Sequence, residues 1–157
     1  MEFIKNPFEG KNTHHAALWE MLVRRDIKAF VEGDWSQVEH DFLPDKFSGM
    51  NAHFSTNPQQ WKLDFPLLLD YQKRWLSQSH ESKNKNYAEP LELGIHKVTK
   101  LEKFQIKSNK AAVWKKFNGK IKLSDGMHDV FQWQTIYFCE LFKKKWKIIG
   151  FIGYLPL

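Results

Sequence analysis

The spacing of apolar residues changes about half-way along the chain, from a helical period to a strand period. The first helical segment is predicted over residues 13–32, with Asn12 or Thr13 as its N-cap and Gly33 as its stop. Its apolar residues recur every three or four positions and form one buried stripe: Trp19, Leu22, Val23, Ile27 and Phe30.

Two shorter helices are predicted in the same half. One covers residues 34–43, where Ser36 and Glu39 have the spacing of a capping box and Pro44 follows the end. The other begins at residues 65–66, with Asp64 as a possible cap and a proline in its first turn, and runs to about residue 79. Residues 47–54 between them are predicted as a short strand.

The second half is predicted to be strands only. After a polar linker at residues 80–86, candidate strands cover residues 91–106, 110–123, 126–142 and 146–157. Asp125-Gly126 predicts a hairpin turn, Asn109 a weaker one, and the lysines at 143–145 close the terminal hairpin. Helices followed by an antiparallel meander favour an α+β fold, with the helices on one face of the sheet, and residues 1–157 as one domain.

Composition narrows the setting of the protein. The chain has 157 residues, 15% of them aromatic, and a single cysteine, Cys139, in an apolar strand. One cysteine excludes a disulfide framework and a cysteine-based metal site, which indicates a reducing, cytoplasmic setting. Neither a signal-like segment nor an apolar run of membrane-spanning length is present, so we expect no membrane association.

The net charge of +6 raises the question of nucleic acid as a partner. The lysines are scattered along strands, in the turn at 143–145 and in the polar linker, a pattern typical of a solvated surface with protected strand edges. We therefore do not expect nucleic-acid binding.

Several short motifs follow one another along the chain: Arg25-Asp-x-x-Ala-Phe30, Asp34-Trp35, Asp41-Phe42, Phe47-x-Gly49, Trp61-x-Leu-x-Phe-Pro66 with Tyr71 and Trp75, Trp146-Lys-Ile-Ile-Gly150 and Gly153-Tyr-Leu-Pro156. Their order resembles the nuclear transport factor 2-like superfamily, also called SnoaL-like. Their spacing resembles an uncharacterised bacterial branch. The resemblance implies a cone of about three helices on a strongly curved, mainly antiparallel sheet. Some members of the superfamily move protons next to carbonyls without a cofactor, and others only bind ligands or partners.

Asp26 is the first candidate catalytic residue, because it lies on the apolar stripe of the first helix. A buried carboxylate without a partner has a raised pKa and suits proton transfer. The alternative is a structural anchor, paired with an arginine such as Arg74 or with a tryptophan N–H. His15 and Trp19 lie on the same helix and are predicted to contact a ligand.

His53 is the second candidate catalytic residue. It alternates with Asn51 along the short strand, so both side chains are predicted on one face, at the mouth of the cone, where they would exchange a proton with a substrate and polarise its carbonyl. The alternative is a surface histidine. Four further residues are predicted to line the pocket: Tyr71, Trp75, Gln132 and Gln134.

No histidine pair has metal-ligand spacing and no phosphate-binding loop is present, so we expect no metal and no cofactor. The sequence thus predicts a pocket for a small apolar ligand, with cofactor-independent isomerase, dehydratase or cyclase-like chemistry as one possibility. The alternative is a non-catalytic ligand-binding or dimeric interaction module. The strand at residues 130–141 is apolar on both faces, which predicts a homodimer through the sheet.

Overall fold

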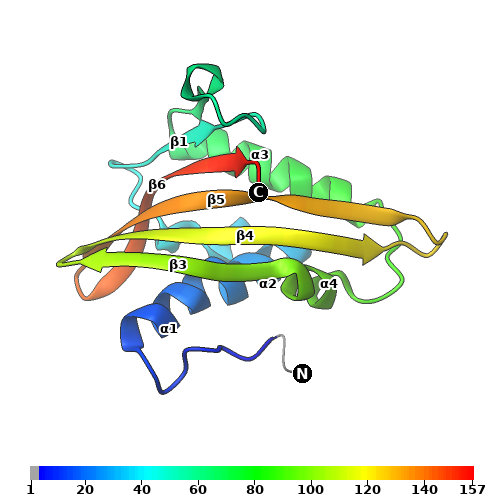
Figure 1. Cartoon of the computed structure of the whole chain (residues 1–157), viewed down its shortest axis with the longest axis horizontal. Helices are drawn as coiled ribbons and strands as arrows, with labels where there is room; N and C mark the ends of the chain where they lie inside the picture. The colour runs from blue at the N-terminus through cyan, green and yellow to red at the C-terminus, as the bar shows by residue number, and fades with distance from the viewer. Residues whose placement is uncertain (1–3) are drawn as a thin grey trace.

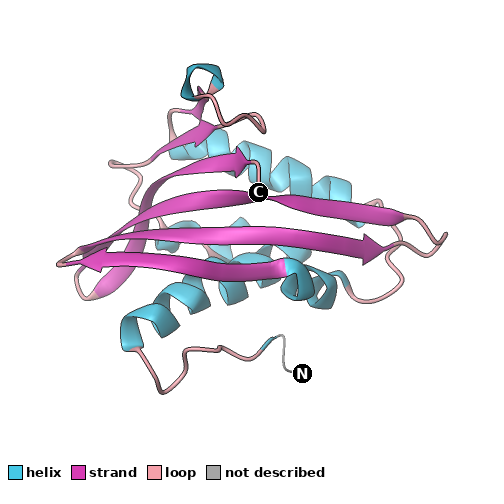
Figure 2. Cartoon of the chain, viewed as in Figure 1, coloured by secondary structure: helices cyan, strands magenta, loops and turns pink. Residues whose placement is uncertain are grey.

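The computed structural model describes residues 4–157, which form a six-stranded sheet with four α-helices (Figures 1 and 2). The strands are β1 (Ser48–Asn51), β2 (Lys62–Phe65), β3 (Thr99–Lys107), β4 (Lys110–Lys122), β5 (His128–Phe142) and β6 (Lys145–Leu155). Their order across the sheet is β2-β1-β6-β5-β4-β3, and every neighbouring pair is antiparallel except β1 with β6. The predicted α+β class with a mainly antiparallel sheet is confirmed.

The first predicted helix is present over its whole length. It consists of α1 (Thr13–Trp19), a π-helical segment η2 (Glu20–Arg25) and α2 (Asp26–Glu32). The Asn12 side chain accepts a hydrogen bond from the N–H of His15, and Gly33 ends the helix in the left-handed conformation at φ 71°. The π-helical segment was not predicted, and it lies directly before Asp26.

Two predicted elements in the first half are different in the structure. Residues 34–43 form two short 3₁₀ turns, η3 (Trp35–Gln37) and η4 (Glu39–Asp41), because the Asp34 side chain caps the first turn and Val38, at φ −121°, interrupts the helix. Strand β2 was not predicted, and it includes Phe65, where we had placed the start of a helix. Helix α3 (Leu68–Lys83) begins after Pro66 instead and extends into the predicted linker.

The prediction of a strand from residue 91 was wrong in its first part. Residues Leu91–Val98 form helix α4, which follows Pro90 and places Leu91, Ile95 and Val98 on one helical face. Gly94 permits a close approach to β4, since a Cβ atom there would lie 2.9 Å from Ile121. Strand β3 then begins at Thr99.

The helices cover one face of the sheet, which Figure 1 shows with the long strands in front of α2 and α3. The core lies between these layers and extends across the sheet from β1 to β3. Near β1 it is aromatic: the ring of Trp35 stacks on Phe42, and Phe42 contacts Phe47 edge-on. Tight strand packing requires a glycine at position 150, because a Cβ atom there would lie 2.6 Å from the Ser48 carbonyl oxygen. Within the described residues, no helix has the length and apolar character needed to cross a bilayer.

Candidate functional site

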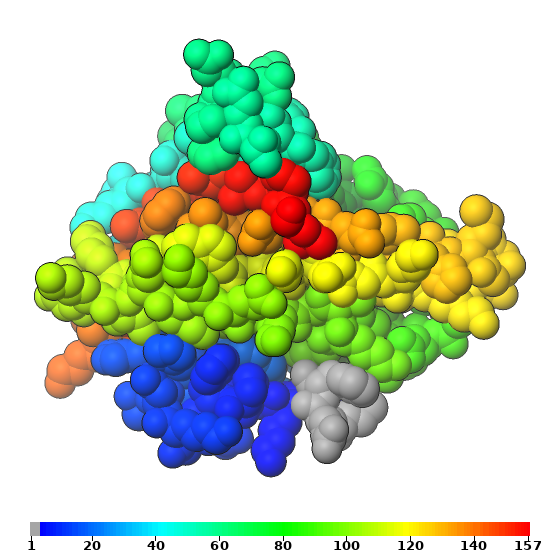
Figure 3. Space-filling view, viewed as in Figure 1, coloured from blue at the N-terminus to red at the C-terminus, as the bar shows by residue number. Residues whose placement is uncertain are grey.

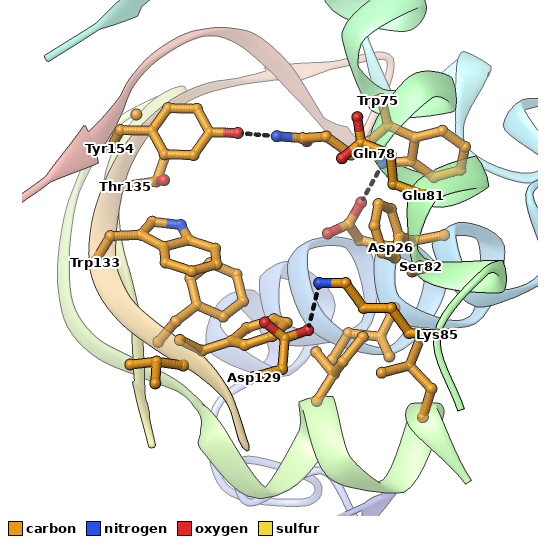
Figure 4. A pocket seen from close by; sticks show the side chains of 18 of the residues that line it. Asp26, Trp75, Gln78, Glu81, Ser82, Lys85, Asp129, Trp133, Thr135 and Tyr154 are labelled. Carbon is orange, nitrogen blue, oxygen red and sulfur yellow. Dashed lines mark hydrogen bonds and ion pairs between the residues drawn. The ribbon is translucent and has the colours of Figure 1, made fainter. Parts of the chain in front are cut away.

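A cavity of about 250 Å³ lies between the helices and the concave face of the sheet (Figure 4). The helix side of its wall comes from α2, α3 and α4, and the sheet side from β4, β5 and β6. Residues facing it from the helices include Asp26, Phe30, Tyr71, Trp75, Gln78, Glu81 and Ile95. Residues facing it from the strands include Phe117, Phe131, Trp133, Thr135, Tyr137 and Tyr154.

The sheet side of the cavity is a continuous row of aromatic rings. The centroid of the Trp133 ring lies 4.8 Å from that of Phe117, 5.1 Å from that of Phe131 and 6.0 Å from that of Tyr154. Successive residues of a strand point to opposite faces, so the odd-numbered positions of β5 from 129 to 137 all face the cavity. The row gives the cavity a flat, apolar wall.

Asp26 supplies a carboxylate on the helix side. Its Oδ2 accepts a hydrogen bond of 2.8 Å from Lys115 Nζ, and its Oδ1 accepts one of 3.2 Å from the indole Nε1 of Trp75. The Lys115 side chain is fully buried, and its ammonium also donates to the carbonyl oxygen of Leu22 in the π-helical segment. The Asp26 side chain remains 30% exposed. The ammonium therefore lies in the protein interior, and the carboxylate lies at the cavity.

Two tyrosine hydroxyls belong to the same part of the site. Tyr71 of α3 and Tyr137 of β5 hydrogen-bond to each other, and both are influenced by the charge of Asp26. Burial raises the pKa of both hydroxyls well above the ordinary value for tyrosine, and the negative Asp26 raises them further. Both hydroxyls therefore stay protonated, and because one donates to the other, the accepting hydroxyl keeps its own O–H as a hydrogen-bond donor for a ligand.

The mouth of the cavity is polar. Lys85 Nζ lies 3.1 Å from Asp129 Oδ2, and the hydroxyl of Tyr87 donates to the same oxygen at 2.7 Å. Burial, followed by this hydrogen bond, raises the pKa of Tyr87. On the other side, the Gln78 amide donates to the hydroxyl of Tyr154 (Figure 4).

Strand β6 has one extra residue opposite β5 near Tyr154. The register passes from Ile136 with Ile152 to Gln134 with Leu155, which is the pattern of a β-bulge. Tyr154 has a φ of 54°, in the left-handed region that side chains other than glycine seldom adopt. The bulge and the bond to Gln78 hold its ring against the cavity.

The fold of the chain is similar to that of several solved structures. No family model matches the chain, and no curated protein matches it in sequence. Among solved structures, an NTF2-like protein of unknown function from Pseudomonas putida superposes with a TM-score of 0.57 at 13% identity, covering 94% of this chain and 91% of its own. The chain has the nuclear transport factor 2-like fold.

Two further solved structures have this nuclear transport factor 2-like fold in common with the chain. A nuclear transport factor 2-like superfamily protein from Salmonella enterica has a TM-score of 0.54 at 10% identity, with 89% of each chain covered. A ketosteroid isomerase-like protein from Erwinia carotovora has a TM-score of 0.51 at 11% identity, with 90% of this chain and 95% of the other covered. At these identities the likeness establishes the fold alone.

The nuclear transport factor 2-like fold brings three of the predicted site residues together: Asp26, Tyr71 and Trp75 all line the cavity. Asp26 has the tryptophan N–H partner that we considered, but its cationic partner is Lys115, and Arg74 instead lies over the ring of Phe65. Trp19 is buried beside His96, with 6.1 Å between ring centroids, and does not line the cavity.

His15 also lies outside the cavity, because its position on α1 is turned toward β3. Its ring stacks on Phe104 with 4.0 Å between centroids, and Phe8 contacts it edge-on. Eleven residues, close to three α-helical turns, separate His15 from Asp26 and would place both on one face, but the intervening π-helical segment changes the periodicity.

The pair His53 and Asn51 is placed away from the cavity mouth. The backbone turns after β1, so that His53 has a φ of 51° and its N–H donates to the side chain of buried Asn51. The His53 Nε2 lies 3.0 Å from Asp64 Oδ2 on the outer edge of the sheet. The alternation expected for a straight strand does not apply at this turn.

Gln132 and Gln134 point away from the cavity as well. The prediction placed these two even-numbered residues in the pocket, whereas the neighbouring odd-numbered positions 131, 133 and 135 line it. The Gln134 amide donates to the carbonyl of Pro156 at 2.8 Å, and Gln132 is exposed. Both lie on the convex face of the sheet.

Several residues of the site were not predicted, above all Lys115, Tyr137 and Trp133. A signal for Lys115 was present in the sequence. The residues at 111, 113, 115 and 117 share one face of β4, and three of these four are apolar. A lysine at an inward-facing strand position needs a buried anionic partner. Asp26, a carboxylate on the apolar stripe of the first helix, is such a partner.

Proposed function

We propose that the cavity binds one small, mostly apolar molecule, whose polar end is fixed at the Asp26 carboxylate. The observation that carries the proposal is that the Asp26 side chain, 30% exposed, lies in a cavity whose sheet side is a row of aromatic rings. Ligand pockets combine an apolar lining with a few convergent polar groups, as here. The volume of about 250 Å³ restricts the ligand to a compact molecule.

The hydrogen bonds around Asp26 support this role. Lys115 and Trp75 hold the two carboxylate oxygens from behind, so the group does not need to reorganise when a ligand arrives. The exposed part of the carboxylate faces a wall on which a flat molecule has rings to stack. Orientation and apolar contact therefore come from opposite sides of the same cavity.

A pair of tryptophan variants on α3 tests the binding site. Ser82 lines the cavity, whereas Ser77 is exposed on the same helix and does not line it. Ser82→Trp should close the cavity and abolish the binding of apolar fragments observed by ligand-detected NMR. Ser77→Trp should leave it unchanged. Equal binding by the wild type and both variants would overturn the proposal.

Proton transfer on the bound molecule is a second candidate function. It is favoured by the carboxylate of Asp26 together with the Tyr71 and Tyr137 hydroxyls, whose raised pKa keeps them protonated. Asp26 would accept a proton from a carbon next to a carbonyl and return it elsewhere, and a tyrosine hydroxyl would donate a hydrogen bond to the carbonyl oxygen. Wild-type protein in D₂O should then exchange the α-hydrogens of a bound ketone, and Asp26→Asn should not. If the ketone exchanges no faster with the protein than in D₂O without protein, the proton-transfer function is contradicted.

The convex face of the sheet supports a homodimer as a further proposal. Met50, Ile152, Ile136 and Trp114 are neighbours in register across four strands, on the face opposite the cavity. Phe138, 39% exposed, continues this apolar surface. Figure 3 shows β3 to β6 as adjoining bands across the face, with no helix over them.

The mass of the protein in solution tests the proposed dimer. Light scattering should give twice the monomer mass at micromolar concentration, and Ile136→Lys should return the mass of a monomer. A monomeric wild type would contradict the dimer.

A further inference from the structure

The charges around the cavity are opposite in sign to the charge of the whole protein. The chain has a net charge of +6, but three carboxylates line the cavity against one ammonium group. The carboxylates are Asp26, Glu81 and Asp129, and the ammonium is that of Lys85. This local excess of negative charge disfavours an anionic ligand.

Two of the three carboxylates have cationic partners within the protein. Asp26 is paired with Lys115, and Asp129 with Lys85. Glu81 differs, since it forms no salt bridge with any other residue in the described part of the chain. It is exposed and also lines the cavity, on the helix that carries Trp75 and Gln78 (Figure 4). Glu81 is therefore the cavity carboxylate whose charge no cation of the described residues balances.

The aromatic row of Phe117, Phe131 and Trp133 lies on the sheet side of the same cavity. The faces of aromatic rings attract cations, and the attraction increases where water is excluded. The protein itself uses one of these rings in this way, because the Lys115 ammonium lies 5.1 Å from the centroid of Phe117. A ligand cation in the cavity would have ring faces on the sheet side and the carboxylates Asp26 and Glu81 on the helix side.

We propose that the ligand is an organic cation, a compact apolar body that carries one amine or quaternary ammonium group. This inference rests on the proposed function, because it defines the polar end of the molecule bound in the cavity. The ammonium group lies between the aromatic row and the carboxylates of the helices, and the apolar body fills the remaining space. A neutral molecule of the same shape gains the apolar contacts, but it gains neither the attraction to the ring faces nor the attraction to the carboxylates.

Three probes of nearly the same shape test the charge preference. They are 4-hydroxyphenyltrimethylammonium, 4-tert-butylphenol and 4-hydroxybenzenesulfonate, which carry a cationic, a neutral and an anionic group on one phenol ring. Isothermal titration should give a dissociation constant about tenfold lower for the cation than for the neutral probe. The sulfonate should bind most weakly.

The outcomes distinguish this inference from the proposed function. If the tert-butyl probe binds in the cavity as tightly as the cation, or the sulfonate binds more tightly, the cation inference is overturned while the binding site stands. If none of the probes binds and the fragments of the NMR experiment do not bind either, the proposed function fails together with it.

A glutamate pair provides the matched control. Glu81→Gln should lower the preference for the cationic probe over 4-tert-butylphenol severalfold. Glu9→Gln removes the same charge from an exposed position that does not line the cavity, and it should change neither affinity. An equal loss of cation binding in both variants would show that only the overall charge matters, and would overturn the assignment to Glu81.

Discussion

Asp26 and Glu140 are both carboxylates that pair with lysine, but they differ in which partner is buried. At Glu140 the carboxylate is the buried partner, with 7% of its side chain exposed, while its partners Lys46 and Lys110 are 55% and 54% exposed. At Asp26 the lysine is fully buried and the carboxylate is 30% exposed. The two sites have the same chemistry in opposite orientations.

The orientation determines what each pair is able to do. The oxygens of Glu140 are occupied by two ammonium groups that extend into solvent, an arrangement that fixes β5 to neighbouring segments and offers nothing to a ligand. The Asp26 carboxylate is held from the interior and open toward a cavity. A buried ammonium behind an accessible carboxylate is thus the feature that distinguishes the proposed binding site from the ion pair at Glu140.

The largest effect is expected from Asp26→Asn. The substitution leaves Lys115 in a fully buried position without a counter-charge, and breaking a buried pair in this way costs about 3–5 kcal/mol. Urea unfolding should show a loss at the lower end of this range, because Asp26 itself is partly exposed. A loss below about 1 kcal/mol would contradict the buried-ammonium description.

The double variant Asp26→Asn/Lys115→Met sharpens this result. Methionine fills much of the volume of the lysine stem and removes the charge that lacks a partner, and apolar replacements of buried ion pairs are often neutral. The double variant should therefore recover most of the stability lost in Asp26→Asn while remaining unable to orient a polar ligand. Double and single variants of equal stability would show that the pair is not coupled.

A smaller effect is expected from Glu140→Gln, because both lysine partners return to solvent. Hydrogen bonds from Lys110 and Lys46 lower the pKa of Glu140 in the folded protein. The ionised carboxylate therefore stabilises the fold above the unfolded pKa of about 4.3. This contribution is lost as the pH falls through the lower folded pKa. Urea unfolding from neutral pH toward pH 2 should show a decreasing difference in stability between wild type and variant. A difference that stays constant with pH would contradict the stabilising role of the ionised Glu140 carboxylate.

The last prediction concerns chemical labelling of Cys139, which lies next to Glu140 on β5, and it involves no substitution and no change in stability. Burial raises the pKa of this thiol to about 12, so that it is protonated at pH 8. Labelling by an aromatic disulfide reagent should be slow in the folded protein and fast in denaturant. Rapid labelling under native conditions would show that this part of the core opens readily.

Much of the fold was predictable from the sequence because the strong periodic signals are local. The first helix, the three turns at residues 109, 125–126 and 143–145, and the long strands that they join are present, although β3 begins at Thr99 and not at residue 91. Helix α4 and strand β2 were not predicted. The apolar residues of α4 suit a strand as well as a helix, and β2 exists only because its four residues pair with β1.

The site was predictable only in part, because it depends on which face of each strand meets the helices. Asp26, Tyr71 and Trp75 lie on helices whose apolar stripe already defines the inward side. Strand β5 is apolar on both faces, so its sequence did not distinguish Gln132 and Gln134 from Phe131 and Trp133. The pairing of Asp26 with Lys115 joins residues 89 positions apart and required the folded arrangement.

A crystal structure with a bound fragment is the most direct test of the central claim, that the Asp26 carboxylate serves a ligand. The fragment should be the one that binds most tightly in the NMR experiment and that Ser82→Trp excludes. The account predicts that it lies against the ring of Trp133, with its polar group within hydrogen-bonding distance of Asp26. A cavity filled by side chains, with the fragment on the convex face of the sheet, would contradict it.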